Sequence, residues 1–157
     1  MNSKALFPGT FDPFTNGHLD VVNKGLGIFD EIIIAIGTNA SKKEMFSLDQ
    51  RINWIKAIFK SKPAVSVISY SGLTVQICEE IGATFILRGL RTVTDFEYER
   101  QIALVNESLV PGIQSVFVMS GQENSIVSST IIRDLIRHGG DFKKYLPSEI
   151  VIPSIPL

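Results

Sequence analysis

The sequence is poor in the residues from which covalent cross-links and metal sites are built. Its 157 residues include one cysteine, Cys78, and two histidines, His18 and His138. A single cysteine excludes an internal disulfide and a cysteine-based zinc site, and it suits a reducing compartment. Two histidines are too few for a histidine-built metal site. We expect Cys78 to be a small apolar residue buried on a helix.

Long hydrophobic runs and an excess charge are also missing. No apolar run approaches membrane-spanning length, and the first residues lead into a strand without the apolar segment of a signal peptide. The net charge is −1, so bulk attraction to nucleic acid or to an anionic membrane is not expected. Apolar residues make up 45% of the chain, enough for a folded core. We therefore expect a cytoplasmic protein with a single domain over residues 1–157.

Three motifs of nucleotide-binding and hydrolytic enzymes are absent. The sequence contains no Gly-x-x-x-x-Gly-Lys-Ser/Thr, no Gly-x-Gly-x-x-Gly and no Gly-x-Ser-x-Gly. These absences exclude a Walker-type NTPase, a dinucleotide-binding fingerprint and a hydrolase with a nucleophile elbow. The class of reaction that remains is phosphoryl or nucleotidyl transfer, in which the protein positions the reactants and stabilises charge.

Short apolar runs alternate with helical patterns along the chain. We expect strands at 5–7, 31–37, 65–69, 84–88 and 115–119, and helices at 17–29, 47–59, 73–81, 95–109 and 128–138. The run at 31–37 is rich in β-branched residues, which indicates a strand buried on both faces. Ser47 and Gln50 have the spacing of a capping box. This order predicts an α/β fold with a doubly wound, Rossmann-like, five-stranded parallel sheet, whose ligands lie at the carboxyl ends of the strands.

Four polar clusters follow predicted strands and so fall on one edge of the sheet. They lie at residues 10–18, 39–43, 88–91 and 124–130. Each has an ordinary explanation: solvated lysines, arginines paired with nearby acids, or serines that cap a helix. Their coincidence on one edge instead favours a crevice for a ligand with several phosphate groups.

The first cluster places His18 at the start of a predicted helix. Gly9 and Gly17 allow the backbone to approach a ligand closely, and Thr10 adds a side-chain donor. A helix N-terminus carries unpaired N–H groups and partial positive charge, which favour phosphate. A packing histidine in a plain loop is the alternative, but the clustering favours a nucleotide site.

Two segments carry a family resemblance. The Thr-Asn-Gly-His sequence at 15–18 is similar to the (H/T)xGH signature of the nucleotidylyltransferase superfamily, and residues 127–133 are similar to its ISSTxxR signature. Together with residues 8–13, 41–43, 88–91 and 95–99, the chain resembles the bacterial phosphopantetheine adenylyltransferases. The match covers nearly the whole chain in order.

The resemblance implies a reaction. The family joins 4′-phosphopantetheine to ATP and forms dephospho-coenzyme A and pyrophosphate, with magnesium. The attacking group is itself a phosphate with a second pKa of about 6. Direct in-line attack therefore needs alignment and charge stabilisation, but no general base and no covalent intermediate. The loops carry few carboxylates, so we expect Mg²⁺ to be held mainly through substrate phosphates, without protein ligands. Coenzyme A is the expected inhibitor.

The resemblance also implies residue roles. The expected catalytic residues are His18, Lys42, Arg91 and Ser129. The expected ATP-binding residues are Thr10, Phe11, His18, Gly89, Leu90, Arg91, Glu99, Asn124, Ser125, Ile126, Val127, Ser128, Ser129 and Thr130. The expected residues that bind the acceptor are Thr10, Lys42, Thr74 and Arg88. The family commonly has an aromatic residue at the position of Asn124 and often an aromatic residue or histidine at that of Ile126, so packing around the adenine is expected to differ.

Two other functions remain open on the residues alone: a sister transferase that uses CTP or another acceptor, and a nucleotide-binding module without catalysis. The helix at 95–109 is apolar on more than one face, so it is either buried in the monomer or shared with a neighbour. The resemblance favours the second case and implies a homohexamer.

Overall fold

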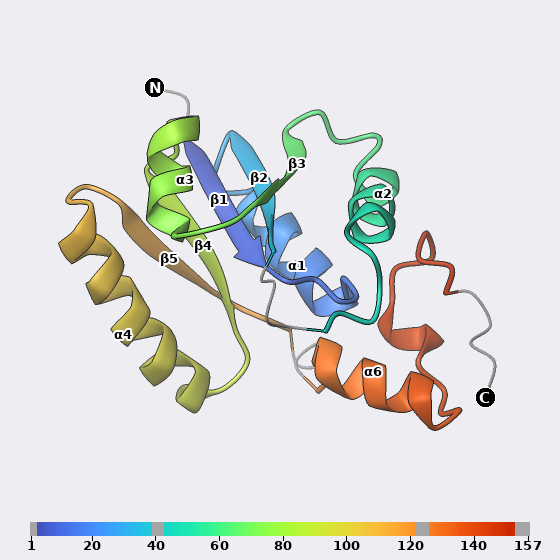
Figure 1. Ribbon diagram of the computed structural model, residues 1–157. Coiled ribbons are helices and arrows are strands. Elements are labelled where there is room, and N and C mark those ends of the chain that lie inside the picture. The colour runs from blue at the N-terminus through green and yellow to red at the C-terminus, as the bar shows by residue number, and fades with distance from the viewer. Residues whose placement is uncertain (1–2, 39–42, 122–125, 153–157) are drawn as a thin grey trace.

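The computed structural model describes residues 3–38, 43–121 and 126–152, and within them a parallel sheet is flanked by helices (Figure 1). The strands are β1 (Lys4–Gly9), β2 (Glu31–Gly37), β3 (Val65–Tyr70), β4 (Phe85–Leu90) and β5 (Gln114–Met119). The helices are α1 (Asn16–Gly25), α2 (Leu48–Ile58), α3 (Thr74–Ile81), α4 (Val93–Leu109) and α6 (Ser129–Arg137), followed by the short 3₁₀ helix η1 (Lys143–Tyr145). The predicted alternation is confirmed.

The strand order is β3-β2-β1-β4-β5, and every neighbouring pair is parallel. The chain moves outward from β1 through β2 to β3, then returns to the other side of β1 with β4. The reversal leaves a crevice beyond the carboxyl ends of β1 and β4, where ligands bind in doubly wound folds. The fold class is therefore the one predicted.

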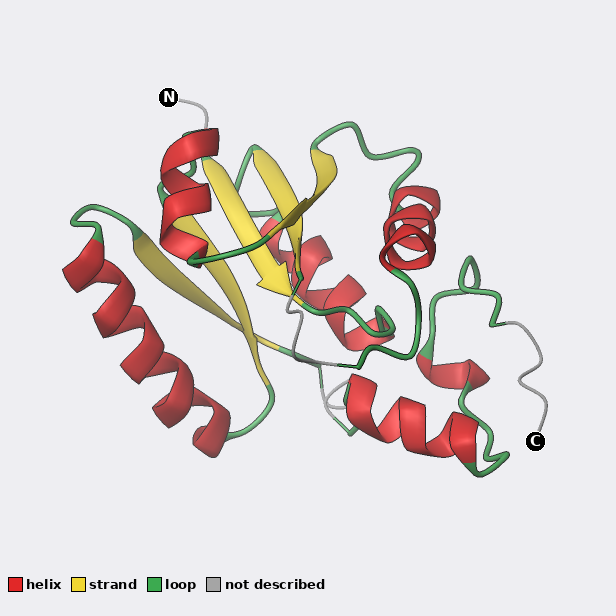
Figure 2. Cartoon of the chain, in the orientation of Figure 1, coloured by secondary structure: helices red, strands yellow, loops and turns green. Residues whose placement is uncertain are grey.

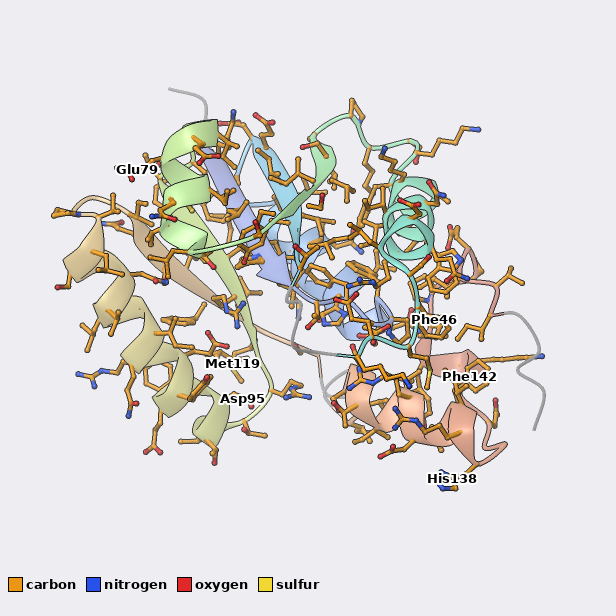
Figure 3. All side chains as sticks on the ribbon, viewed as in Figure 1. Phe46, Glu79, Asp95, Met119, His138 and Phe142 are labelled. Atoms are coloured by element: carbon orange, nitrogen blue, oxygen red, sulfur yellow. The ribbon has the colours of Figure 1, made fainter. Side chains whose placement is uncertain are left out.

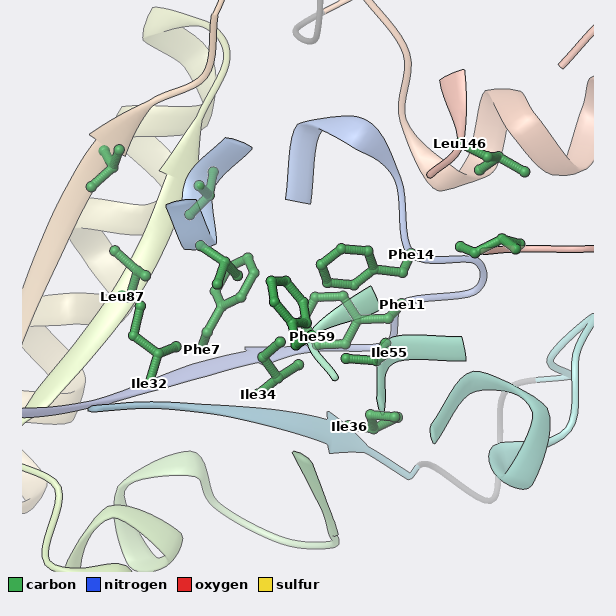
Figure 4. Packing of buried hydrophobic residues seen from close by; sticks show 14 of the residues in the cluster. Phe7, Phe11, Phe14, Ile32, Ile34, Ile36, Ile55, Phe59, Leu87 and Leu146 are labelled. Carbon is green, nitrogen blue, oxygen red and sulfur yellow. The ribbon is translucent and has the colours of Figure 1, made fainter. Parts of the chain in front are cut away.

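Helices cover both faces of the sheet (Figure 2), and each face carries its own apolar layer. On β2, Ile32, Ile34 and Ile36 pack in one cluster, while Ile33 and Ala35 pack in the other. The first cluster contains apolar residues of α1, α2 and α6. Figure 4 shows part of it, with Ile55 of α2 beside Ile34 and Ile36 of β2. The second contains residues of α3. The strand at 31–37 is thus buried on both faces, as its β-branched run indicates.

The lone cysteine lies in the second layer. Cys78 is fully buried on α3, as expected, and burial raises the pKa of its thiol to about 11. It is therefore a packing residue with a protonated thiol at neutral pH.

Two helix boundaries differ from the prediction. α1 ends at Gly25, four residues before Phe29, because the following residues form a turn in which the Ile28 and Phe29 N–H groups both donate to the Gly25 carbonyl. α4 begins at Val93 and not at Asp95, since the side chain of Thr92 accepts the Asp95 N–H at 3.1 Å and caps the helix. The capping box of α2 is confirmed by reciprocal bonds between Ser47 and Gln50.

α4 differs from the other helices of the sheet in its burial. None of its 17 residues is buried, and Leu104, Val105 and Leu109 are each more than half exposed. It lies along β5 at the edge of the sheet (Figure 1). Its own chain therefore covers only part of its apolar surface.

The segment after α6 packs against the first apolar layer. Beyond η1, Leu146 and Ile150 are buried against the first apolar layer. Up to residue 152 the described chain contains no longer helix here, which agrees with the proline at 147. None of the helices in the described segments is both long enough and apolar enough to cross a membrane.

Candidate active site

A cavity of about 590 Å³ lies beyond the carboxyl ends of β1 and β4. Its walls come from the segment after β1, the first turn of α1, the end of β4, the start of α4 and the first turn of α6. These parts of the chain meet because β1 and β4 are neighbours at the reversal of strand order. Two helix N-termini therefore face one cavity, as the sequence predicts.

The turn after β1 is shaped by the Phe11 side chain. Phe11 has a φ of 50°, in the left-handed region that non-glycine residues rarely occupy, and its ring is buried against Phe7, Phe14 and His18. A Cβ on Gly9 would lie 2.8 Å from that ring. Gly9 is thus needed for the inward packing of Phe11 as much as for any ligand.

His18 is held as a neutral hydrogen-bond donor at the mouth of α1. The Thr15 N–H donates to His18 Nδ1 at 3.0 Å, and the Thr15 side chain caps the helix. Because Nδ1 accepts this bond, the proton of the neutral ring is on Nε2. Burial, followed by the nearby charges of Arg91 and Arg88, lowers the pKa of His18 from 6.5 to about 4. At neutral pH the ring therefore carries no charge and has one N–H to offer.

The first turn of α6 is tied to the same turn of chain. Ser128 caps the helix by accepting the Ile131 N–H. Ser129 Oγ donates to the Pro13 carbonyl at 2.8 Å, and Arg133 Nη1 donates to the Asp12 carbonyl at 2.6 Å. These bonds join the second signature segment, residues 127–133, to residues 12 and 13, which directly precede the first signature at 15–18.

Arg88 lies between the main cavity and a smaller one. Its guanidinium pairs with the Glu99 carboxylate through two bonds and donates to the Pro8 carbonyl at 2.9 Å. The smaller cavity, of about 190 Å³, shares Arg88 and Glu99 with the first and extends to Thr74 and Tyr70, whose hydroxyls lie 3.0 Å apart. Arg88 is thus accessible from both cavities.

Arg91 is anchored more loosely. It lies 3.2 Å from the Asp95 carboxylate, and its side chain is 40% exposed. Partial burial raises the pKa of Asp95, but hydrogen bonds from Arg91 outweigh it and hold that pKa below its ordinary value. Asp95 lies at the start of α4, whereas the second histidine, His138, lies at the far end of α6 (Figure 3). Because the Arg91–Asp95 pair is partly exposed, a bound anion readily rearranges it.

The cavity wall carries four acidic and four cationic side chains. Its acidic residues are Asp12, Glu44, Asp95 and Glu99, and its cationic ones are Lys43, Arg88, Arg91 and Arg133. Each acid already binds a partner: Asp12 accepts the Met45 and Phe46 N–H groups, and the other three pair with arginines. The sequence predicts few carboxylates in these loops, and the structure instead shows four, each bound to a partner within the protein. In the described segments no group of three His, Cys, Asp or Glu residues could hold a metal ion.

Comparison with known proteins shows to which family the chain is similar. The family model described as "Cytidylyltransferase-like" matches residues 6–135. A curated protein of Flavobacterium psychrophilum is 52% identical over 147 residues, which cover 94% of this chain and 97% of that protein. One of Leptospira biflexa is 43% identical over 150 residues, covering 96% and 94%. Both are named phosphopantetheine adenylyltransferase.

This chain belongs to the phosphopantetheine adenylyltransferase family. It is an enzyme of the nucleotidyltransferase class. Among solved structures, a bifunctional NMN adenylyltransferase/ADP ribose pyrophosphatase of Francisella tularensis, complexed with AMP and a manganese ion, superimposes with a TM-score of 0.68 at 18% identity. The match covers 93% of this chain and 44% of that longer one, and it shows that the two share a fold.

Most of the predicted residues of this family member lie together. The main cavity is lined by Thr10, Phe11, His18, Arg88, Gly89, Arg91, Glu99, Val127, Ser128, Ser129 and Thr130. Thr74 lines the smaller cavity, and Ile126 lines a separate hollow beside Lys144 and Tyr145. Leu90 does not line any of these cavities, because its side chain is buried beneath the end of β4. Lys42, Asn124 and Ser125 lie outside the described residues.

Sequence reasoning missed Glu44 and Arg51. Arg51 is 1% exposed and donates to the Thr10 carbonyl at 2.7 Å, and it pairs with Glu44 on the cavity wall. A signal was available: Arg51 stands one helical turn before Ile55, so both fall on the buried face of the predicted helix. A charged side chain on such a face requires a specific partner.

Proposed function

We propose that this enzyme transfers the adenylyl group of ATP to 4′-phosphopantetheine, forming dephospho-coenzyme A and pyrophosphate. One observation carries the proposal. A cavity faced by two helix N-termini adjoins a smaller one, and Arg88 is shared between them. The larger cavity suits a nucleotide triphosphate, and the smaller one, which Thr74 also lines, suits the acceptor with its phosphate at Arg88. The names of the curated relatives fit this pair of substrates.

The proposed chemistry is a single in-line displacement. An oxygen of the acceptor phosphate attacks the α-phosphorus of ATP and forms a new phosphorus–oxygen bond. The bond to the β-phosphate oxygen breaks, and pyrophosphate leaves with the bonding pair. The acceptor phosphate is largely ionised at neutral pH, so the protein needs to align the reactants and stabilise charge, not to remove a proton.

His18 and Arg88 have complementary roles in this proposal. His18 donates its Nε2–H to a non-bridging oxygen of the α-phosphate, where negative charge grows in the transition state. Its low pKa makes it a neutral donor, so it does not deliver a proton to the leaving group. Arg88, oriented by Glu99, receives the acceptor phosphate at the junction of the two cavities.

Arg91, Lys42 and Ser129 complete the predicted set. Arg91 has the more exposed side chain and is suited to the ATP phosphates. Lys42 directly precedes Lys43 on the cavity wall, which supports its predicted role beside the reacting phosphates. Ser129 uses its hydroxyl to hold Pro13, so we assign it to positioning and leave anion contact to the N–H groups of its helix.

Magnesium fits this site through the substrate. The carboxylates of the wall are already paired, and the wall cations are balanced by them, so a triphosphate would bring uncompensated negative charge. Mg²⁺ held by the phosphates would supply the missing charge. No carboxylate of the chain is required as a ligand in this arrangement.

The test measures pyrophosphate release with ATP, CTP or GTP, each with and without 4′-phosphopantetheine. We expect release with ATP only when the acceptor is present, and at least tenfold less with CTP or GTP. Release that ignores the acceptor, or a preference for CTP, would overturn the assignment in favour of a sister transferase.

The assembly, inhibition and location of the enzyme belong to the same proposal. The exposed apolar side chains of α4 support a closed oligomer, for which the family resemblance implies six subunits. Light scattering should give six times the 17.3 kDa mass of the chain. Coenzyme A shares the pantetheine arm of the acceptor, so competitive inhibition is expected in the same pyrophosphate assay. The cytoplasm, where the acceptor would be used, is the proposed location and is tested by cell fractionation.

A further inference from the structure

Arg51 differs from the other arginines around the site because it does not line any cavity. Its side chain is fully buried on α2, and it is the largest side chain with less than 2% exposure among the described residues. A buried guanidinium is costly unless its donors are used. Its contacts therefore show what it holds in place.

Those contacts converge on the turn after β1. Nη1 donates to the Thr10 carbonyl at 2.7 Å, Nη2 pairs with Glu44, and Nε lies 3.4 Å from the Ser47 carbonyl. Arg51 and Thr10 are 41 residues apart in the sequence, so this bond ties α2 to the turn on the side away from the cavity. Arg51 thus fixes the direction of one carbonyl at the base of the cavity.

The direction of that carbonyl also sets the direction of a donor. The Thr10–Phe11 peptide is trans, so the Phe11 N–H points opposite to the Thr10 C=O. Thr10 and Phe11 line the main cavity, whereas Arg51 lies behind them. With the carbonyl turned to Arg51, the N–H is directed to the cavity, and within the described segments it has no hydrogen-bond acceptor.

We propose that Arg51 is a positioning residue that holds the Thr10–Phe11 peptide with its N–H directed at a phosphate of ATP. Without this contact the peptide could rotate and present its carbonyl, which would repel an anion. The left-handed φ of Phe11 makes such control necessary, because this backbone conformation is strained for a non-glycine residue. Glu44 supplies the counter-charge and links the same guanidinium to the chain that follows Lys42. The inference rests on the proposed nucleotide site, but not on the identity of the acceptor.

The main experiment compares two variants that differ only at Arg51. In Glu44→Gln the side chain at position 44 can still accept from Arg51, and the Thr10 contact remains. In Glu44→Gln with Arg51→Met the Thr10 contact is lost, and neither charge is left buried without a partner. ATP binding is measured calorimetrically in the presence of Mg²⁺ and without acceptor.

We expect the double variant to bind ATP at least tenfold more weakly than Glu44→Gln, and its kcat to fall by about 10²-fold, as for loss of one oriented backbone donor. Ile55→Ala is the control for stability, since Ile55 is fully buried one turn further along α2 and lines no cavity. It should lower Tm and keep ATP affinity within twofold. If the double variant also keeps ATP affinity within twofold of Glu44→Gln, Arg51 only stabilises the fold and the proposal is wrong.

A second measurement needs no substitution of Arg51. Selective ¹⁵N labelling of the ten phenylalanines gives ten amide signals, and Phe11→Tyr identifies that of residue 11 by its disappearance. On addition of ATP the Phe11 amide proton should shift downfield more than those of the other phenylalanines. An unmoved Phe11 signal at saturating ATP would overturn the proposal. A protein that binds ATP in this way but releases no pyrophosphate with the acceptor would contradict only the proposed function.

Discussion

The turn after β1 and helix α4 line the same cavity, but they are built in opposite ways. In the turn, the carbonyls of Thr10, Asp12 and Pro13 each accept a bond from an arginine or serine side chain of α2 or α6, and just before it Pro8 of β1 accepts one from Arg88 of β4. α4 has no buried residue along its whole length. It reaches the site through the Arg88–Glu99 and Arg91–Asp95 pairs near its first turns.

The monomer alone preorganises the turn after β1, whereas it leaves the apolar face of α4 uncovered. Side chains of α2 and α6 hold the turn by hydrogen bonds, so its N–H donors have a set direction before any ligand binds. The outward face of α4 carries apolar side chains that the described chain does not cover. We therefore expect substitutions at the turn to change catalysis and folding, and substitutions on α4 to change assembly.

The largest expected effect is on kcat, and it comes from removing the His18 side chain, which donates a hydrogen bond beside the turn. His18→Ala should lower kcat by about 10²–10³-fold, because one hydrogen bond to the developing charge is lost. The KM for ATP should change little. Steady-state kinetics on the purified variant provide the measurement.

Phe14→Leu serves as its control, because Phe14 packs on the His18 ring and lines no cavity. It should retain kcat within about threefold, as expected for a packing change alone. Equal losses in kcat for both variants, or a loss confined to ATP affinity for His18→Ala, would mean that His18 acts by packing or by ground-state binding.

The next effect is on stability. Asp12 is a buried carboxylate that accepts the Met45 N–H at 2.8 Å and the Phe46 N–H at 2.9 Å. Asp12→Ala leaves these donors unpaired and should lower the free energy of unfolding by about 2–4 kcal/mol in urea titrations. The exposed partner of Arg137 offers a matched test: Asp134→Ala should cost less than about 0.5 kcal/mol. Similar losses for the two would show that the turn is not held as described.

The free energy of unfolding should also depend on pH, with a somewhat smaller change than that caused by Asp12→Ala. The pKa of His18 is lowered from 6.5 to about 4 in the folded protein, so the unfolded chain binds its proton more tightly. The contribution to stability is fully present above pH 6.5 and is lost as the pH falls toward 4, by about 2–3 kcal/mol.

Urea titrations between pH 4 and 7 measure this loss. Asp20 and Asp95 also have lowered pKa values, so the comparison with His18→Ala isolates the histidine. That variant should show a flatter profile between pH 6.5 and 4.5. Parallel profiles for the two proteins would place the His18 pKa near its ordinary value.

The smallest effect on the stability of the chain itself is expected on α4. Leu104 is 52% exposed, so Leu104→Glu should change the intrinsic stability by less than about 0.5 kcal/mol. The same charge would be buried in an interface between copies, and we expect the mass measured by light scattering to fall toward 17.3 kDa. An unchanged mass would remove α4 from the interface. A wild-type mass of 17.3 kDa would contradict the oligomer.

Individual residues show how far the sequence analysis reached into the site. His18, Arg88, Arg91 and Ser129 were predicted from motifs, and they do line one cavity. Their partners were not identified from the sequence, which offers several acids near Arg88, and the structure pairs Arg88 with Glu99. Arg51 was missed, because a helix pattern shows that a position is buried but not what it contacts. The one-domain organisation and the roles of the individual residues remain predictions.

The sequence by itself determined the order of strands and helices, the strand buried on both faces and the capping box at the start of α2. These features depend on periodicity and on neighbours within a few residues, and such signals are local. Only the tertiary structure decided that Arg51 supports Thr10, that Arg88 faces two cavities and that α4 has no buried side. Those outcomes depend on which crossovers bring distant segments together, and hydrogen-bond geometry then selects one partner from several that are chemically equivalent.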